Sequence, residues 1–424
     1  MPRNFFSNAP IIGKQKKTDD SELMEEQELV IQIPSDTDIA QMKKMPAGGV
    51  EDQMQRIANM VDVIKQYATV PIITTEEITL ADHWQKLFFL IDAGDTDQAC
   101  SVLRTLSATD IILQALLAIH SLEYLQQIIS YCIKSQHSGS IRLNADIVVT
   151  PKTFEILIKD LATTLFNSTK LKCSFGLPTH HAYSDEGSGF CLVNKVAVLM
   201  KYIERTHTLP LKYIIVGTDV NRDNGLCNVL MHSASHMDIC HVDIFDSRVY
   251  PHQDHSFISK EFETSGTDVG KNIMCWQKNQ LNYFAVDLSL TTRKTISVHP
   301  ALLFALSKIS EQIDSAKTTD QKVVLLIPMG WDSHEDETAY CGKLIDGRMM
   351  APSAAAKCRY NDGDLVYFYE TLFKLCNKNK ELLAGMYWGL EGGYDRTMYE
   401  RQIHLMMQVI DNQLHHQNSS RMKY

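Results

Sequence analysis

The chain lacks the features that mark a membrane protein, a secreted protein or a nucleotide-binding enzyme. No apolar run approaches the roughly 18 residues that a transmembrane helix requires. The first thirty residues contain no apolar segment behind a basic start, so we expect no secretory signal peptide. Glycine-rich phosphate loops of the two common nucleotide-binding patterns are also missing. These absences predict a soluble, cytoplasmic protein that does not bind nucleotides.

Paired cysteines and an excess of positive charge are missing too. The ten cysteines are scattered without a C-x-x-C pair, which is typical of reduced thiols and argues against a zinc finger or a disulfide scaffold. With 51 acidic and 41 basic residues, the formal net charge is −10. Because nucleic-acid binding requires Lys and Arg to neutralise phosphates, we expect no direct nucleic-acid binding. The charge is compatible with a basic partner.

The composition of the 424 residues is that of an ordinary globular protein, with 44% hydrophobic and 22% charged residues. No Pro-, Gly- or Ser-rich linker and no internal repeat divides the chain. Both ends are polar. We therefore predict one large domain at 28–414, between a polar N-terminal extension at 1–27 and a polar C-terminal tail at 415–424.

Short apolar runs and helical patterns together indicate the fold class. The runs are four to eight residues long and are rich in β-branched or bulky residues, which predicts buried strands. They lie at Leu171–Phe175, Tyr213–Val216, Val323–Ile327 and Leu382–Tyr387. Amphipathic helical stripes, such as those at 54–64, 122–132 and 193–203, lie before and between them. This alternation predicts an α/β fold with a central, mostly parallel sheet covered by helices on both faces.

Polar residues follow each predicted strand. Because ligands of open α/β sheets bind beyond the carboxyl ends of the strands, we expect these side chains to share one active site there. In chain order they are His180, His181, Asp219, Asn221, Asp332 and Tyr394.

Three of these residues could bind a metal ion. Asp219 and Asn221 are two residues apart on an extended segment, so their side chains point to the same side, and Asp332 arrives from another strand. Two carboxylates and an amide oxygen suit a divalent cation. Each aspartate taken alone is more often a helix N-cap or a turn residue.

The other three could act on a substrate. An isolated histidine doublet such as His180–His181 is usually structural, but a neutral imidazole beside a metal-bound water can take its proton. Tyr394 could donate its O–H to a developing oxyanion, or it could be an ordinary turn aromatic after the Gly392–Gly393 pair.

Six segments taken together resemble, in order, the motifs of the zinc-dependent histone deacetylases and acetylpolyamine amidohydrolases, which share the arginase–deacetylase fold. The resemblance covers about residues 45 to 412. The matching segments are HSLEYL at 120–125, HHAYSDEGSGFC at 180–191, DVNRDNG at 219–225, VYP at 249–251, GWDSHED at 330–336 and LEGGY at 390–394.

Transferred position by position, the resemblance implies a Zn²⁺ site and a set of catalytic residues. Asp219, Asn221 and Asp332 are implied as the metal ligands. His181 is implied as the general base and later acid, and His180 as its electrostatic partner. Further roles are implied for Tyr394 (polarising the acyl carbonyl), Asn224 (orienting His181), and Gly189, Phe190, Tyr250, Gly392 and Gly393 (binding the acyl-lysine substrate).

Three positions depart from the family pattern. Asn221 stands where a histidine ligand is usual, so we expect weaker zinc binding or a broader choice of divalent metals. Gly217 replaces an aspartate that, in the family, usually orients the first histidine and helps to bind a monovalent cation. Whether this chain binds a monovalent cation is therefore left open. Asp243 is a candidate replacement carboxylate. Ala339 lies near the expected tunnel mouth and predicts a wider entrance there.

The resemblance leaves three functions open. The first is a lysine deacetylase that acts on a basic peptide such as a histone tail. Such an enzyme would take part in chromatin regulation. The second is a deacylase for acetylpolyamines or long-chain acyl-lysine. The third is a non-catalytic, deacetylase-like scaffold, suggested by Gly217, Asn221 and Arg222. The divergent motif at 219–225 would also suit a bacterial effector acting in a host nucleus, or a nuclear enzyme; the oligomeric state is left open.

Overall fold

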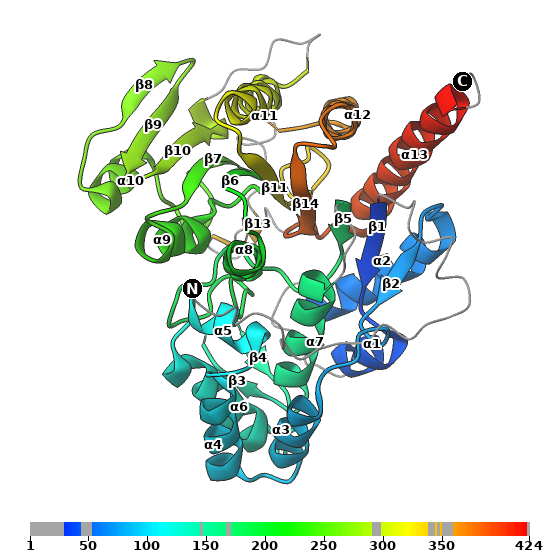
Figure 1. Ribbon diagram of the computed structural model, residues 1–424, viewed down its shortest axis with the longest axis vertical. Coiled ribbons are helices and arrows are strands. Elements are labelled where there is room, and N and C mark those ends of the chain that lie inside the picture. Colours follow the sequence, from blue (N-terminus) through cyan, green and yellow to red (C-terminus); the bar gives the residue numbers. More distant parts are fainter. Residues whose placement is uncertain are drawn as a thin grey trace, which may run out of the picture.

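The computed structural model describes residues 29–43, 53–144, 147–166, 171–290, 298–337, 344–345, 348–349 and 359–421. A ten-stranded sheet runs through the molecule (Figure 1). In order across the sheet, its strands are β2 (Ile72–Thr74), β1 (Leu29–Ile33), β5 (Leu171–Ser174), β14 (Leu383–Leu390), β11 (Lys322–Met329), β6 (Leu211–Gly217), β7 (Asp238–Phe245), β10 (Leu281–Asp287), β9 (Ile273–Lys278) and β8 (Thr267–Gly270).

The sheet is mostly parallel, as predicted. Each neighbouring pair from β2 to β10 is parallel, whereas β9 and β8 are added antiparallel at one edge. The four strands predicted from apolar runs are β5, β14, β11 and β6, which lie side by side at the centre. Their carboxyl ends therefore meet at one edge of the sheet, which is where the predicted active-site residues lie.

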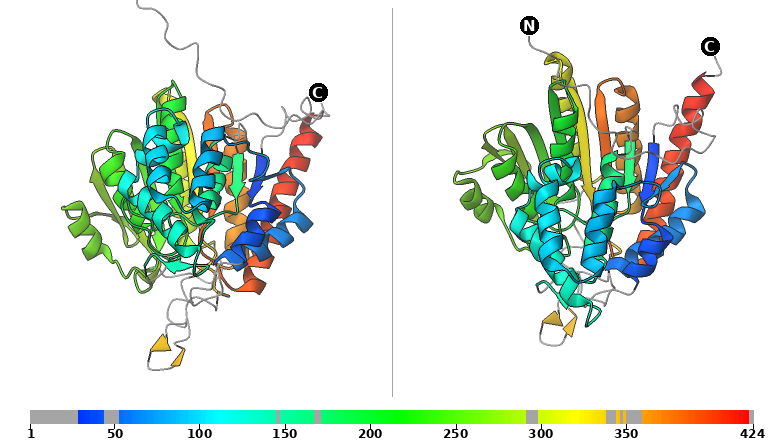
Figure 2. Two further views of the ribbon diagram at one scale, coloured as in Figure 1. Left: turned by 90° about the horizontal axis from the view of Figure 1, so that it is seen from below. Right: turned by 60° about the horizontal axis from the view of Figure 1, so that its bottom comes forward.

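Helices cover both faces of the sheet, because alternate residues of each central strand point to opposite sides (Figure 2). In β6, for example, Ile215 packs into one apolar core and Ile214 into the other. The first core is closed by α3 (Asp82–Asp92), α4 (Thr96–Leu106), α5 (Ile111–Leu117), α6 (Leu122–Ser135), α7 (Thr153–Phe166), α8 (Lys195–Thr206), α9 (Asn224–Ser233) and α10 (His255–Phe262). The second is closed mainly by α2 (Gln53–Tyr67), α11 (Pro300–Thr318), α12 (Asp362–Lys378) and α13 (Arg396–Arg421).

The smaller elements lie outside the main sheet. Helix α1 (Asp36–Met42) follows β1 and contributes to both cores, and the 3₁₀ helix η2 (Leu288–Leu290) follows β10. Two short antiparallel pairs complete the described elements: β3 (Ile141–Arg142) with β4 (Val148–Val149), and β12 (Leu344–Ile345) with β13 (Arg348–Met349).

The predicted helical stripes correspond to α2, α6 and α8. In the described residues no single helix is long and apolar enough to cross a membrane; α4 and α5 meet that length and composition test only as a pair, bent by 95°. The domain limits at 27/28 and 414/415 stay predictions. Residues 1–27 and Ala339 lie outside the described residues.

Candidate active site and metal centre

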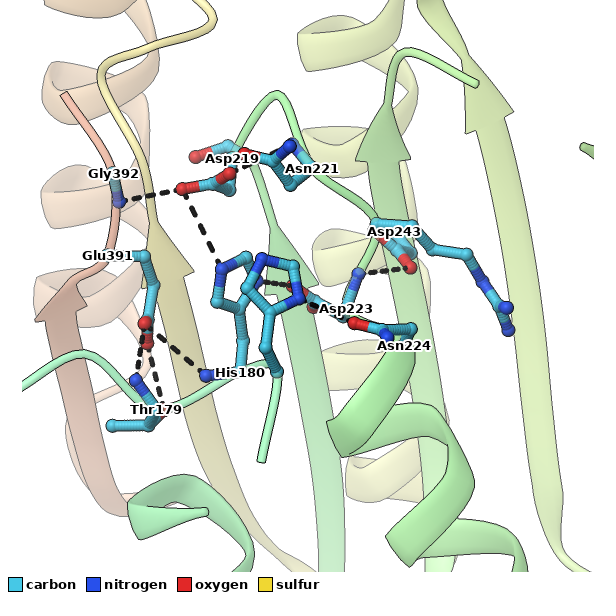
Figure 3. Close-up of polar contacts among 12 residues, drawn as sticks. Thr179, His180, Asp219, Asn221, Asp223, Asn224, Asp243, Glu391 and Gly392 are labelled. Atoms are coloured by element: carbon cyan, nitrogen blue, oxygen red, sulfur yellow. Dashed lines mark hydrogen bonds and ion pairs between the residues drawn. The ribbon is translucent and has the colours of Figure 1, made fainter. Parts of the chain in front are cut away.

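Two buried carboxylates converge beyond the ends of β6 and β11 (Figure 3 shows the first). Asp219 Oδ2 accepts a hydrogen bond from the backbone N–H of Gly392 (2.7 Å), and Asp332 Oδ1 accepts one from Val220 N–H (3.0 Å). A Cβ on Gly392 would overlap Asp332 Oδ2 and would lie 2.7 Å from Asp219 Oδ2. A Cβ on Gly330 would overlap Asp219 Oδ2. These glycines therefore let the backbone approach both carboxylates closely.

The electrostatics of this pair fit a cation. Burial raises the pKa of Asp219, and burial together with the negative charge of Asp219 raises the pKa of Asp332 well above its usual value. Asp332 Oδ2 is buried and has no hydrogen-bond partner among the described residues. Two adjacent buried carboxylates with one unpartnered oxygen among the described residues match the oxygen ligands that a divalent ion requires.

Asn221 lies beside Asp219 (Figure 3). Its backbone N–H donates to Asp219 Oδ1 (2.8 Å), and its Nδ2 donates to the backbone oxygen of Tyr250 (2.7 Å). Because the amide nitrogen is bound to Tyr250, the amide oxygen is the atom left for a cation. The role of Asn221 as a metal ligand remains a prediction. The oxygen donors of Asp219, Asn221 and Asp332 are chemically suited to a divalent ion.

The histidine pair lies in the loop between β5 and α8, with the two ring centroids 3.9 Å apart. The start of α9 holds this loop, since Leu226 N–H donates to the backbone oxygen of His180 (2.9 Å). The Glu391 carboxylate holds it from the other side by accepting from Thr179 N–H (2.6 Å) and Thr179 Oγ1 (2.9 Å). The structure therefore places His180 and His181 side by side, next to the two carboxylates.

The two buried imidazoles differ in charge. Burial alone would lower the pKa of His180, but the nearby carboxylates, Asp219 first among them, outweigh it and raise the pKa to about 10. Asp219 Oδ2 lies 3.9 Å from His180 Nε2. Burial and the neighbouring charge of His180 lower the pKa of His181 well below its usual value. At neutral pH His181 is therefore the neutral imidazole of the pair.

Hydrogen bonds fix which nitrogen of His181 carries the proton. Its Nδ1 bonds Asn224 Oδ1, and Asn224 Nδ2 donates to Tyr183 Oη (2.6 Å). Since Asn224 presents its oxygen, His181 Nδ1 is the donor and Nε2 is left as a proton acceptor. This contact agrees with the orienting role predicted for Asn224.

Two of the residues predicted to line the substrate tunnel, Gly189 and Tyr250, lie against His181. Gly189 has a φ of +49°, and a Cβ there would overlap the His181 ring. The Tyr250 ring meets the His181 ring edge to face at 5.1 Å, and Tyr250 Oη bonds Ser188 Oγ (2.6 Å). Phe190 lines a cavity of about 20 Å³ formed mostly by apolar residues. Gly189, Phe190 and Tyr250 are all partly exposed, and of the three Gly189 and Tyr250 contact the His181 ring.

Tyr394 lies on the loop between β14 and α13. Its backbone N–H donates to Glu337 Oε2, and the Arg56 guanidinium lies 4.7 Å from its ring centroid. The same guanidinium donates to the backbone oxygens of Gly393 (2.9 Å) and Glu391 (2.7 Å). Arg56 is fully buried. Helix α2 thus fixes the loop that carries Tyr394, whose action on a carbonyl stays a prediction.

The carboxylate bound to His180 is not the one considered from the sequence. Asp223 Oδ1 lies 2.8 Å from His180 Nδ1 (Figure 3). Asp243, the residue considered, accepts instead from Asp223 N–H (3.1 Å) and from Tyr283 Oη (2.6 Å). The assignment to Asp243 was therefore wrong, because spacing along the chain does not determine which of two nearby carboxylates reaches the imidazole.

Three contributors to the site were missed in the sequence: Asp223, Glu391 and Arg56. The first two lie inside the segments 219–225 and 390–394, so the motifs themselves carried the signal. Arg56 lies on an amphipathic helix far away in the chain, and nothing in the local pattern pointed to it. Arg222, which also differs from the family pattern, is buried and donates to Tyr283 Oη (3.0 Å) and to the Glu261 carboxylate (2.6 Å). Neither partner is one of the predicted metal ligands.

Other buried groups in the described residues could also hold an ion. The ligand atoms of His180, Cys191 and Glu391 lie within 4.8 Å of one another, as do those of Asp223, His241 and Asp243. All cysteines in the described part of the chain are free thiols. The first group contains His180, and the second contains Asp223, which lies two residues from Asn221 in the same loop.

Comparisons with known proteins identify the family and the fold. The family model "Histone deacetylase domain" matches residues 89–410. Histone deacetylase 18 and histone deacetylase 5 of Arabidopsis thaliana are each 43% identical over 61 residues, which is 13% of this chain and 9% of either relative. Histone deacetylase 6 of Caenorhabditis elegans is 37% identical over 60 residues, 14% of this chain and 6% of that protein. The crystal structure of the HDA15 HD domain shares the fold, with a TM-score of 0.54 at 15% identity over 90% of both chains.

Proposed function

This chain belongs to the histone deacetylase family, and we propose that it is a zinc-dependent hydrolase that removes acetyl groups from lysine side chains. The observation that carries the proposal is the packing of His180 and His181 against each other, with His180 Nε2 3.9 Å from one of two converging carboxylates. The carboxylates raise the pKa of His180, and burial lowers the pKa of His181. Membership of the family supports a deacetylase hydrolase. Zinc dependence, the lysine and histone specificity and the residue roles belong to the proposal.

Asp219, Asp332 and the amide oxygen of Asn221 would hold the metal ion. A divalent ion bound there supplies Lewis-acid activation of a water molecule and of the amide carbonyl. The unpartnered Asp332 Oδ2 and the raised pKa of both carboxylates support this assignment. Because an amide oxygen binds zinc less strongly than imidazole, other divalent ions are expected to compete.

His181 would move the proton. Its Nε2 is the free acceptor, so it takes a proton from the attacking water and later returns it to the leaving lysine amine. The C–N bond breaks in that second transfer, and acetate and the free amine are the products. The positive charge of His180 would stabilise negative charge that develops on the substrate, and the Tyr394 hydroxyl would donate to the same oxygen.

The substrate class follows from the surroundings of His181. Gly189, Phe190 and Tyr250 would enclose the acyl-lysine stem, and Gly392 and Gly393 would let it approach the carboxylates. A cationic peptide such as a histone tail suits a chain with a net charge of −10. Chromatin would then be the site of action, in the nucleus of the producing cell or of a host.

An acetyl-lysine peptide assay tests the proposal. Zinc-loaded protein should release acetate from a histone-tail peptide, and Tyr394→Phe should lower kcat at least ~100-fold, because one oxyanion donor is commonly worth 10²–10³ in kcat. The control Tyr367→Phe changes a half-exposed tyrosine on α12 and should retain wild-type kcat. Equal, slow acetate release by wild type and Tyr394→Phe would refute a catalytic role for this site. Faster turnover of acetyl-spermidine or a long-chain acyl peptide would change the substrate and keep the chemistry.

The second candidate is a non-catalytic scaffold, favoured by Asn221 and Gly217. Its distinguishing result is protein that retains no stoichiometric divalent ion after purification and dialysis against zinc. The burial of Arg222 away from the carboxylates weighs against it, because this divergent side chain does not fill the metal position.

A further inference from the structure

Asp223 joins two buried imidazoles that come from different parts of the chain. Its Oδ1 lies 2.8 Å from Nδ1 of His180, and its Oδ2 lies 2.9 Å from Nε2 of His241 on β7. Asp223 and His241 are fully buried, and His180 is 3% exposed. Its backbone N–H is also held, by Asp243. The position of this carboxylate is thus fixed at both oxygens and at the main chain.

Space for this carboxylate exists because residue 217 is a glycine. Gly217 ends β6, and a Cβ there would overlap Asp223 Oδ2 and lie 2.8 Å from Asp223 Cγ. The φ of Gly217 is not in the left-handed region, so the backbone conformation does not require glycine. A side chain at 217 and the carboxylate of Asp223 therefore compete for one volume.

The contact with Asp223 determines which nitrogen of His180 carries a proton. Asp223 Oδ1 lies 2.8 Å from His180 Nδ1, and a carboxylate oxygen accepts hydrogen bonds, so His180 Nδ1 is the donor. The ring is then oriented with Nε2 toward Asp219, at 3.9 Å.

His241 hydrogen-bonds the carboxylate of Asp223. Its Nε2 bonds Asp223, while its Nδ1 is buried without a hydrogen-bond partner among the described residues. Its ring packs edge to face on Tyr283 at 5.1 Å. A buried imidazole with one unsatisfied nitrogen lowers stability, so its position is best explained by what it holds.

We infer that Asp223 is the positioning residue of His180. Asp223 reaches the imidazole from the loop before α9 because Gly217 leaves space at the end of β6. His241 orients the Asp223 carboxylate. The inference rests on the proposed function, since positioning matters only if His180 acts in the reaction. It adds two residues to that function and makes residues 217 and 223 interdependent.

A carboxylate exchange tests the inference in the full-length, zinc-loaded protein. Asp223→Gly should lower kcat on the acetyl-lysine peptide about 10–100-fold with little change in KM, because the loss is in orientation and not in substrate binding. The double variant Gly217→Asp/Asp223→Gly should recover at least tenfold of that loss. The matched control Gly217→Ala/Asp223→Gly fills the space without a carboxylate and should recover nothing.

A second readout does not depend on turnover. NMR of protein with ¹⁵N-labelled histidine should show a strongly hydrogen-bonded His180 Nδ1–H in wild type and in the exchanged double variant. Asp223→Gly and the alanine control should lose it. Asp223→Asn is nearly isosteric and serves as the test if the larger changes prevent folding. It should lower kcat about tenfold and shift this resonance.

The outcomes separate the inference from the proposed function. Wild-type kcat in folded Asp223→Asn, or equal rescue by Gly217→Asp and Gly217→Ala, would overturn the positioning role. If the wild-type protein is inactive but shows the His180 resonance, and this resonance shifts in Asp223→Asn, the deacetylase activity is overturned and the contact between Asp223 and His180 is retained.

Discussion

The two ends of the central sheet bury charge in opposite ways. At the carboxyl ends of β5, β6, β11 and β14, the loops carry two histidines and several carboxylates, and the carboxylates accept hydrogen bonds from backbone N–H groups and from the His180 imidazole. At the amino ends of β5, β11 and β14, a cavity of about 190 Å³ is lined mostly by apolar side chains, with Lys172 among them. The Lys172 ammonium donates to Thr164 O (2.9 Å).

This difference shows how the fold separates stability from chemistry. At either end, burial raises the free energy of a charged group. At the amino ends, burial lowers the pKa of Lys172 to about 8, which disfavours the charge. At the carboxyl ends, loop N–H groups and histidines stabilise the charges, and the remaining negative charge on Asp219 and Asp332 is suited to a cation.

The largest expected effect comes from removing one negative charge at the carboxyl ends. Asp332→Asn should abolish stoichiometric zinc retention, and it should stabilise the metal-free fold by roughly 1–3 kcal/mol, because it removes a buried charge beside Asp219. Metal analysis and urea unfolding with and without chelator measure both. Zinc should stabilise wild type and not the variant. The control Asp62→Asn, on the exposed face of α2, should change neither quantity. A metal-free Asp332→Asn less stable than metal-free wild type would contradict the repulsion.

The next effect concerns the loop of Tyr394. Arg56→Met should destabilise the fold by roughly 2–4 kcal/mol and lower kcat, because the buried carbonyls of Glu391 and Gly393 lose their donor. Urea unfolding and the peptide assay measure the two losses. Arg104→Met, on the exposed side of α4, is the matched control and should unfold like wild type. Unchanged stability in Arg56→Met would show that the guanidinium does not hold this loop.

The smallest effect is expected at the amino ends. Because the pKa of Lys172 is lower in the folded chain than in the unfolded chain, the unfolded chain binds more protons between about pH 8 and 10.5, and folding stability rises with pH across that range. Lys172→Met should therefore stabilise the fold by roughly 1–3 kcal/mol below pH 8, and this gain should shrink toward pH 10. Urea unfolding at pH 7 and pH 10 measures it. Lys86→Met, on the exposed side of α3, should show no such dependence. A gain that does not depend on pH would assign the effect to packing alone.

The sequence predicted the central strands better than the outer ones. β6, β11 and β14 contain continuous apolar runs because both of their faces are covered, whereas the run of β5 is interrupted by Lys172. β7 was missed, since its run DICHVDIF contains His241 and Asp243 at buried positions. Polar residues in a buried strand need partners from elsewhere in the chain, and a local pattern does not reveal them.

The sequence by itself determined the kinds of group at the site: a histidine doublet, two aspartates, an asparagine and a tyrosine, each placed after a strand. Residue order and residue type suffice for that, because strand ends deliver the residues that follow them. Only the tertiary structure decided which groups meet. The contact of His180 with Asp223 joins residues 43 apart and depends on the space beside Gly217. Such a contact is set by packing between elements, which the order of residues along one segment does not encode.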